Sequence, residues 1–343
     1  MNKKISLADI ANTLGVSKTL VSLVINGKGN DHGISPETQK RVLKKIEELH
    51  YSPNVLARGF RTGKTNTIGL IVSDIANRFY SRIARRVEDY AWDKGYSVVI
   101  CSTDENVEKE KQQIKMLRER KVDGLIISSS QENFEGIGKL LNDIPHVFID
   151  RTFNNIESPQ VYVDNYKGAQ LAANHLVSQG IKKIAMLSIT PEYISTIRER
   201  SEAFVSSLAE SGITIPTQWD IHIPFKNMES AVEDKLQFLK ESNNLPEAIF
   251  TLNNNLTSYC LMALRKLSLS TPHDIALIGF DDMLYFSFTQ PSVSAIAQPI
   301  EQIGEKAFDL LLRQLSGEEI TTKERLVKLP VELIIRDSST KKS

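Results

Sequence analysis

Polar side chains suited to binding a hydroxylated ligand stand at the ends of four apolar runs in this 343-residue chain: Asp74, Asp150 with Arg151, Asn253 and Asp281. Carboxylates and amides accept hydrogen bonds from hydroxyl groups, and a guanidinium donates them. If the runs are strands of open parallel sheets, their carboxyl ends border the crevice in which such sheets bind ligands. The positions therefore predict a cleft that fits the vicinal hydroxyls of a sugar. Each side chain could instead cap a loop or form a salt bridge between lobes.

A second group of residues with possible chemistry lies near the N-terminus. The apolar spacing of residues 7–14 predicts a helix with one buried face, and Gly15 permits a turn after it. Ser17 can then cap a second helix over residues 18–25 by accepting a backbone N–H hydrogen bond. Two short helices joined by a tight turn have the shape of a helix-turn-helix DNA-binding motif.

The start of the second helix would carry the side chains that meet DNA. In this motif the first residues of the second helix contact base edges in the major groove. Lys18 could donate to O6 and N7 of guanine, and Thr19 could bond to a base or contact a thymine methyl group. Ser22 and Leu23 would also point outward. Alternatively, Lys18 and Thr19 are only solvated surface.

The distribution of charge separates the same segment from the rest. Residues 1–65 contain 11 lysines and arginines against 5 aspartates and glutamates, although the whole chain has a formal net charge of zero. A small basic head on an acidic body is suited to binding a polyanion through the head alone. Ser35 and Pro36 predict the start of a third helix in this head. The apolar face of that helix would carry Val42, Leu43, Ile46 and Leu49.

The sequence gives little support for a metal site, an enzyme active site or a membrane segment. Cys101 and Cys260 are the only cysteines and lie in apolar patterns, which predicts reduced core thiols and no metal site. We find no nucleophile elbow, phosphate-binding loop, H-E-x-x-H motif or G-x-G-x-x-G after a strand, so we expect no catalytic residue and no cofactor. No apolar run approaches transmembrane length, and Asp9 and Asn12 interrupt any signal-peptide core. We therefore expect a cytoplasmic protein without membrane contact.

From residue 67 onward, short apolar runs alternate with helical patterns. The runs predict strands at 67–72, 96–100, 124–127, 146–149, 183–187, 221–223, 248–251 and 275–280. Such alternation favours parallel sheets with helices on both faces. Because the strands are too many for one compact sheet and the pattern restarts near residue 162, we expect two doubly wound α/β lobes. The helix over 300–314 should return to the first lobe.

Residues 5–67 resemble the lac-repressor/purine-repressor family of bacterial transcription regulators, and the resemblance continues to about residue 335. It rests on these residues: Ile10-Ala11, Gly15-Val16-Ser17, Val21-Ser22, Tyr51, Pro53-Asn54 and Ala57-Arg58. The resemblance implies an all-α helix-turn-helix head over 1–52, a hinge helix and linker over 53–66, and a body over 67–343 similar to periplasmic sugar-binding proteins. We expect one lobe over 67–161 with 299–330, and the other over 162–298 with 331–343.

For DNA binding, the resemblance implies that the hinge helices of two subunits pair in the minor groove at the operator centre. Each would insert an apolar side chain into the central base step. The matching position is Phe60, where the family more often has leucine; Phe60 could instead pack on the body. The expected DNA-binding residues are Ser17, Lys18, Thr19, Ser22, Leu23, Asn26, Asn54, Val55, Ala57, Arg58 and Phe60.

For ligand binding, the resemblance implies contacts from Arg200, Asn253, Asp281 and Gln298, with the aromatic pair Phe79 and Tyr80 lining the side of the first lobe. Together with the residues at the strand ends, the expected effector-binding residues are Asp74, Phe79, Tyr80, Asp150, Arg200, Asn253, Asp281 and Gln298. Many members of the family sense sugars or their derivatives, and a few sense purines. We expect a sugar or sugar derivative in the cleft between the lobes, with a purine as the alternative.

These observations predict a ligand-responsive transcription regulator, and in particular a repressor that binds a near-palindromic operator in double-stranded DNA. Because the sequence has no C-terminal heptad repeat that would form a tetramer, we expect a homodimer. Two other classes remain as alternatives. An enzyme acting on sugars would have to show turnover, and an exported transport-type binding protein is opposed by the basic head and the missing signal peptide.

Overall fold

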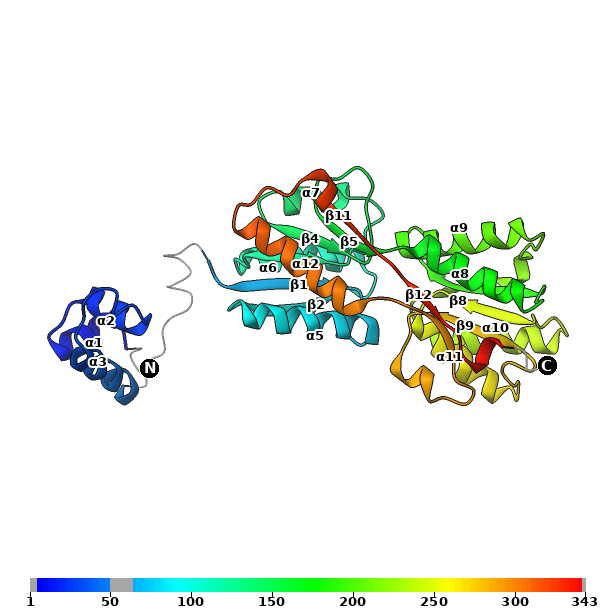
Figure 1. Cartoon of the computed structure of the whole chain (residues 1–343), viewed down its shortest axis with the longest axis horizontal. Helices are drawn as coiled ribbons and strands as arrows, with labels where there is room; N and C mark the ends of the chain where they lie inside the picture. Colours follow the sequence, from blue (N-terminus) through cyan, green and yellow to red (C-terminus); the bar gives the residue numbers. More distant parts are fainter. Residues whose placement is uncertain (1–4, 50–63, 341–343) are drawn as a thin grey trace. The chain divides into compact units, whose positions relative to one another are not determined.

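The computed structural model describes residues 5–49 and 64–340. Contacts between residues divide the chain into two compact units, Met1–Thr65 and Asn66–Ser343. We call the first unit the head and the second the body, and each is described by itself (Figure 1). Within the described ranges no single helix is long and apolar enough to cross a membrane. Only the bent pair Leu7–Leu14 and Lys18–Ile25, with 110° between its helices, meets the length and composition criteria when both are counted together.

Residues 5–49 of the head contain three helices: α1 (Leu7–Leu14), α2 (Lys18–Ile25) and α3 (Pro36–Glu48). A capping box begins α1, in which Ser6 accepts from the amide of Asp9 and the Asp9 carboxylate accepts from the amide of Ser6 at 2.8 Å. Gly15 ends α1 with a left-handed backbone (φ 66°), which allows the sharp turn into the next helix. Ser17 caps α2 by accepting from the amide of Leu20 at 3.1 Å. The predicted helix-turn-helix is confirmed.

The head has a small apolar core of its own. Five apolar side chains from its three helices are buried together: Ile10, Ala11, Val21, Val24 and Val42. Helices this short do not persist alone in water, so this packing holds them. The prediction that Leu43 belongs to the same face is wrong, because Leu43 is 52% exposed. Val42, Ile46 and Leu49 have the i, i+4, i+7 spacing that faces the core, and Leu43 lies beside that row.

The first lobe of the body is a parallel six-stranded sheet in the order β11-β5-β4-β3-β1-β2. Its strands are β1 (Thr67–Val72), β2 (Ser97–Ser102), β3 (Gly124–Ile127), β4 (His146–Ile149), β5 (Gln160–Val163) and β11 (Leu326–Leu329). Its helices are α5 (Arg78–Asp93), α6 (Val107–Glu119), α7 (Glu135–Leu141), α12 (Ile300–Leu315) and α13 (Thr322–Arg325).

Both faces of this sheet are covered, which explains why its strands are continuous apolar runs. Along β1, Leu70 and Val72 belong to the buried cluster that includes α5 and α12, whereas Ile71 belongs to the cluster that includes α6 and α7. Successive side chains of a strand point to opposite faces, so a strand between two helical layers needs no polar face. Helix α12 therefore belongs to the first lobe, although it follows most strands of the second lobe in the sequence (Figure 1).

The second lobe has a six-stranded sheet in the order β12-β10-β9-β8-β6-β7, in which only the β10–β12 pair is antiparallel. Its strands are β6 (Ile184–Thr190), β7 (Asp220–Pro224), β8 (Ala248–Thr251), β9 (Ala276–Phe280), β10 (Ser294–Ala297) and β12 (Glu332–Ile334). Its helices are α8 (Asn165–Ser178), α9 (Ser195–Glu210), α10 (Met228–Glu241) and α11 (Asn254–Lys266), with short 3-10 turns at Thr217–Trp219, Leu284–Ser287 and Asp337–Ser339.

The predicted fold class, a helical head with two parallel-sheet α/β lobes, is confirmed. Each strand predicted from an apolar run is present. Four have the predicted bounds, and in the other four an end is shifted by one to three residues: 96–100 is Ser97–Ser102, and 183–187 is Ile184–Thr190. Strands β5, β10, β11 and β12, of three or four residues each, were not predicted. The two sheet orders also correspond, so that β4 of the first lobe and β9 of the second occupy the same place.

Candidate functional site

The start of α2 forms the candidate DNA-binding surface of the head. Lys18 and Thr19 are the first two residues of this helix, and both are exposed, as is the capping residue Ser17. The capping hydrogen bond fixes the backbone from which the Lys18 and Thr19 side chains extend. The arrangement can present one cation and one hydroxyl to the edges of base pairs.

The other predicted DNA-binding residues lie farther along the chain. Ser22 and Leu23 are half-buried in the head. Asn26 is exposed, and its side-chain amide donates to the carbonyl of Ser22 at 2.6 Å, which ends α2. The predicted hinge residues lie outside the described residues: Asn54, Val55, Ala57, Arg58 and Phe60.

The candidate ligand site is a cavity of about 40 Å³ between the two lobes of the body, which we call the inner chamber. Seven of the eight predicted effector-binding residues line it: Phe79, Tyr80, Asp150, Arg200, Asn253, Asp281 and Gln298. Asp74 is not among the lining residues. Its carboxylate instead accepts from the amide of Ala76 at 2.8 Å and forms a turn before α5.

Arg200 is the main cation on the side of the second lobe. It extends from α9, is 3% exposed, and lies with its guanidinium carbon 3.6 Å from the centre of the Phe280 ring. It donates to the carbonyl of Leu252 at 2.7 Å and to the side-chain oxygen of Asn165 at 2.9 Å. These contacts use part of the guanidinium fork and hold its plane in place, which leaves the group fixed at the wall of the chamber.

Asp281, 4% exposed, is the facing carboxylate of the second lobe. Burial raises the pKa of its carboxyl, and the positive charge of Arg200 and a hydrogen bond from the Gln298 amide oppose that rise. Asp150 of the first lobe raises the pKa further, because its negative charge lies across the chamber. The two carboxylates therefore repel each other, and a group that donates hydrogen bonds to both would relieve this repulsion.

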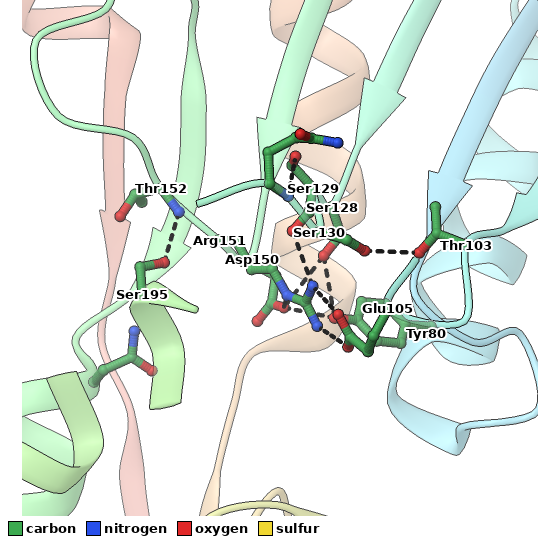
Figure 2. Close-up of polar contacts among 12 residues, drawn as sticks. Tyr80, Thr103, Glu105, Ser128, Ser129, Ser130, Asp150, Arg151, Thr152 and Ser195 are labelled. Atoms are coloured by element: carbon green, nitrogen blue, oxygen red, sulfur yellow. Dashed lines mark hydrogen bonds and ion pairs between the residues drawn. The ribbon is translucent and has the colours of Figure 1, made fainter. Parts of the chain in front are cut away.

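A buried ion pair forms the side of the first lobe. Arg151 donates through both terminal nitrogens to Glu105, one of these bonds being 2.7 Å long, and donates to the carbonyl of Ser129 at 2.9 Å. The side chains of Arg151 and Glu105 are only 8% and 5% exposed. Burial is the largest influence and by itself lowers the pKa of Arg151, but the charges of Glu105, Tyr80 and Asp150 and the hydrogen bond to Glu105 together outweigh it, so the pKa is raised. Figure 2 shows this pair beside Asp150.

Asp150 is held by neighbours of its own lobe. The hydroxyl of Tyr80 donates to Asp150 at 2.8 Å, and the hydroxyl of Ser128 lies 3.4 Å from the same oxygen (Figure 2). Burial raises the pKa of Tyr80, so the phenol stays protonated and acts as a donor. Phe79 packs edge-on against Tyr80 with ring centres 5.0 Å apart. The predicted aromatic pair thus positions a carboxylate as well as lining the chamber.

The two aspartates occupy equivalent places in the two lobes. Asp150 follows β4 and Asp281 follows β9, which are the corresponding strands of the two sheets. Both have a left-handed backbone, with φ of 66° and 73°. Such a backbone turns each side chain away from the strand direction, and it is a conformation that aspartate tolerates better than most residues.

The buried carboxylate of Glu110 holds the loop of residues Ser128 to Gln131 in place. Glu110 of α6 is 0% exposed and accepts from the Ser129 hydroxyl at 2.7 Å and the Ser130 amide at 2.9 Å. Burial raises the pKa of Glu110, and these hydrogen bonds oppose the rise. The Glu110 carboxylate therefore supports, through Ser129 and Ser130, the loop beside the residues that line the chamber. Figure 2 shows Ser129 and Ser130 next to Arg151.

Direct hydrogen bonds join the two lobes around the chamber. The amide of Thr152 donates to the Ser195 hydroxyl at 2.9 Å, as Figure 2 shows, and the Tyr193 hydroxyl donates to the carbonyl of Ser130 at 3.2 Å. Elsewhere between the lobes, the side-chain nitrogen of Asn254 donates to the side-chain oxygen of Asn77 at 3.0 Å. A cavity as small as the inner chamber admits a ligand only if the lobes move apart and some of these bonds break.

Sequence reasoning missed Glu105 and Glu110. Asp150 directly follows β4, whereas Glu105 is the third residue after β2, so the strand-end rule finds Glu105 only when it includes the loop after that strand. Glu110 gave no such signal, because an acid in a charged helix is normally solvated. Within the described ranges no group of three or more His, Cys, Asp or Glu side chains could hold a metal ion.

Two family models match separate parts of the chain. Residues 6–54 match the model of bacterial regulatory proteins of the lacI family. Residues 173–339 match the model of a periplasmic binding protein-like domain. The HTH-type transcriptional repressor PurR of Photobacterium profundum is 31% identical over 335 residues, which cover 97% of this chain and 98% of the relative.

Solved structures show the same fold. A structure of the lac repressor dimer bound to operator and the anti-inducer ONPF is 24% identical, covers 98% of this chain and 100% of that chain, and has a TM-score of 0.85. A periplasmic binding protein/LacI transcriptional regulator from Alkaliphilus metalliredigens QYMF, complexed with D-xylulofuranose, is 29% identical. That match covers 80% of this chain and 98% of the other, with a TM-score of 0.69.

Proposed function

Because this chain belongs to the lacI family of bacterial transcription regulators, we propose that it is a repressor that binds a near-palindromic operator as a homodimer and responds to a sugar or sugar derivative. The ligand would bind in the inner chamber between the lobes of the body. The DNA-binding head would then comprise residues 1–52, the hinge residues 53–66 and the sensor residues 67–343. A regulator of this kind needs no catalytic residue, cofactor or metal.

The observation that carries the proposal is the convergence of polar side chains from both lobes on one buried cavity. Asp150 comes from the first lobe, and Arg200 and Asp281 come from the second. A ligand bound to all of them must favour one relative position of the lobes over others. Ligand binding and lobe position are then linked, because a ligand shifts an equilibrium by its difference in affinity for the two states.

The chemistry of the chamber favours a sugar. Carboxylates at 150 and 281 and amides at 253 and 298 accept or donate hydrogen bonds in the pattern that several hydroxyl groups require. Phe79 offers an apolar surface for the face of a sugar ring. The relative from Alkaliphilus metalliredigens, which was solved with D-xylulofuranose, supports the same assignment.

In the head, Lys18 and Thr19 would contact base edges, with Ser17, Ser22, Leu23 and Asn26 around them, and two heads would read two half-sites. Residues Asn54, Val55, Ala57, Arg58 and Phe60 would contact the minor groove at the centre. The bodies would pair to form the dimer. The ligand would change the spacing of the two hinges and so the affinity for the operator.

The test is a selection from random DNA duplexes with the full-length protein, with and without a panel of sugars and purines. We expect a sequence with two half-sites, and at least one sugar that changes its affinity; the direction shows whether the ligand releases DNA or promotes binding. Asp281→Asn should keep the DNA sequence but lose the ligand response, whereas Asp234→Asn, an exposed carboxylate on α10, should change neither.

Three outcomes would contradict parts of this proposal. Recovery of no sequence at moderate salt would contradict specific DNA binding. Recovery of a single half-site would contradict the dimer. A response to purines alone would leave the repressor in place and replace the sugar.

A further inference from the structure

A second cavity adjoins the inner chamber. Its volume is about 190 Å³, and we call it the outer chamber. Its walls come from both lobes: the loops after β3 and β4 contribute Gln131 and Phe153, and the start of α9 contributes Ser195. Arg151 lines both chambers, so the two cavities are neighbours at this residue. None of the residues expected to bind the effector lines the outer chamber.

The outer chamber has the chemistry of a sugar subsite. Phe134, Phe153 and Tyr193 supply aromatic surface, and Asn133 and Asn154 supply side-chain amides. Glu132 and Arg198 add one charge of each sign. A sugar ring has apolar C–H faces and a rim of hydroxyl groups, and pockets that bind such molecules combine aromatic walls with a few polar groups. A volume near 190 Å³ is roughly that of six water molecules. The outer chamber therefore has room for one sugar ring. The inner chamber, at about 40 Å³, must open before it can hold a second ring.

Two buried polar atoms without a partner belong to residues that line the inner chamber, and one of these residues, Arg151, also lines the outer chamber. The buried Nε of Arg151 and the buried side-chain oxygen of Gln298 have no hydrogen-bond partner among the residues that the structure describes. Buried polar atoms are almost always paired, so each of these suggests a missing partner. One is a donor and one an acceptor, and a hydroxyl group can satisfy either.

The charges around the inner chamber disfavour an anionic ligand. Glu105, Asp150 and Asp281 are three carboxylates, and Arg151 and Arg200 are the two guanidinium groups that accompany them. Arg151 is already paired through both terminal nitrogens with Glu105, and Arg200 faces Asp281. In the inner chamber a phosphate or carboxylate would meet a negative excess, at a cost that low dielectric makes larger. In the outer chamber Arg198 and Glu132 balance each other, and Arg151 is already paired with Glu105.

The outer chamber also contains the bonds that join the lobes. Thr152, Ser195 and Tyr193 line it, and their hydrogen bonds run from one lobe to the other. A ligand unit in this chamber would contact the groups that hold the lobes together. Its presence would therefore affect lobe position directly, and not only through the inner chamber.

We propose that the effector is an uncharged glycoside of two sugar units, with one unit in the inner chamber and the second in the outer chamber. The inference rests on the proposed function, since it names the ligand class of that site. The second unit contacts Asn133, Asn154 and the aromatic walls, and the link between the units passes Arg151.

The test measures binding to the full-length protein by calorimetry with matched sugars. The probes are D-glucose with maltose and cellobiose, D-galactose with lactose, and D-xylose with xylobiose; glucose 6-phosphate and adenine complete the set. We expect one disaccharide to bind at least about tenfold more tightly than its monosaccharide. The double variant Asn133→Ala/Asn154→Ala should weaken that disaccharide about tenfold, because two hydrogen bonds are lost, and change the monosaccharide by less than about twofold. Asn142→Ala, an exposed amide outside both chambers, is the matched control and should change neither.

The outcomes separate this inference from the proposed function. Equal affinity for the mono- and disaccharides would overturn the two-unit ligand and leave a sugar sensor. Tightest binding of glucose 6-phosphate would overturn the exclusion of anions, also within a sugar sensor. Equal loss of both sugars in the double variant would overturn the outer chamber as a separate subsite. Binding of adenine alone, or of no probe, would overturn the sugar assignment and this inference with it.

Discussion

Replacing Glu105 by glutamine tests whether the buried pair with Arg151 holds the first lobe together. The substitution keeps the size of the side chain and removes its charge, so Arg151 remains buried without its main partner. Removing one member of a buried pair costs about 3–5 kcal/mol. Arg151 would keep its bond to the Ser129 carbonyl at 2.9 Å and the Asp150 carboxylate 3.8 Å from its Nε. We therefore expect the lower end, a loss of about 3 kcal/mol.

The assay is urea unfolding of the full-length chain followed by circular dichroism. With a slope of about 3 kcal/mol per molar urea, a loss of this size lowers the midpoint of the body by about 1 M. The matched control is Glu88→Gln, which breaks an ion pair of 3.1 Å with Arg85 on the surface, where the two side chains are 56% and 70% exposed. That pair should contribute no more than about 0.5 kcal/mol.

A second variant distinguishes loss of the pair from general damage to the loop. In Glu105→Gln/Arg151→Met the uncompensated charge is gone, so part of the lost stability should return. The reasoning is refuted if Glu105→Gln costs less than about 1 kcal/mol, or if the double variant is less stable than the single one.

Three further changes have defined outcomes. Lys18→Ala should weaken binding to the selected operator more than binding to random DNA, whereas Lys40→Ala on the exposed side of α3 should affect both alike; equal losses for Lys18→Ala in a filter-binding assay would exclude base reading. Ser6→Ala removes the cap of α1 and should lower the unfolding free energy of the head by about 1 kcal/mol, and an unchanged melting curve would contradict this role. Burial raises the pKa of Glu110 and Asp281, so the folded body keeps protons that the unfolded chain loses above about pH 4. Stability should therefore fall as pH rises from there to the raised pKa values, and Glu110→Gln should flatten that slope in urea titrations; an identical slope would contradict it.

Much of the fold could be predicted from the sequence because strands that are buried on both faces of a sheet are continuous apolar runs. Strand β1 lies between two helical layers and so appears as one apolar run. Strand β12, by contrast, has three residues with at most half-buried side chains, which no periodicity distinguishes from a loop. Leu43 shows the limit within a helix, since an apolar residue next to the buried row is indistinguishable from a member of it until the helices are packed.

Without the family resemblance, the candidate site could be predicted only where strands bring residues to a sheet edge. Asp150 and Asp281 follow strands, and the rule for parallel sheets found them. Arg200 lies on a helix and was predicted only from the family resemblance, because nothing in the local sequence distinguishes it from Arg198. Glu110 acts from behind the loop, and only the packing of α6 against that loop reveals it.

The matching aspartates at the ends of β4 and β9 have a consequence for how such a site can change. A left-handed backbone accepts aspartate, asparagine and glycine far more readily than other residues. At either position a single exchange of aspartate for asparagine removes a charge while the main chain keeps its course. A substitution in one lobe can thus change the charge of the shared cavity without a change in the other lobe. Single substitutions could therefore convert a fold of this kind from binding neutral ligands to binding anionic ones while its backbone stays the same.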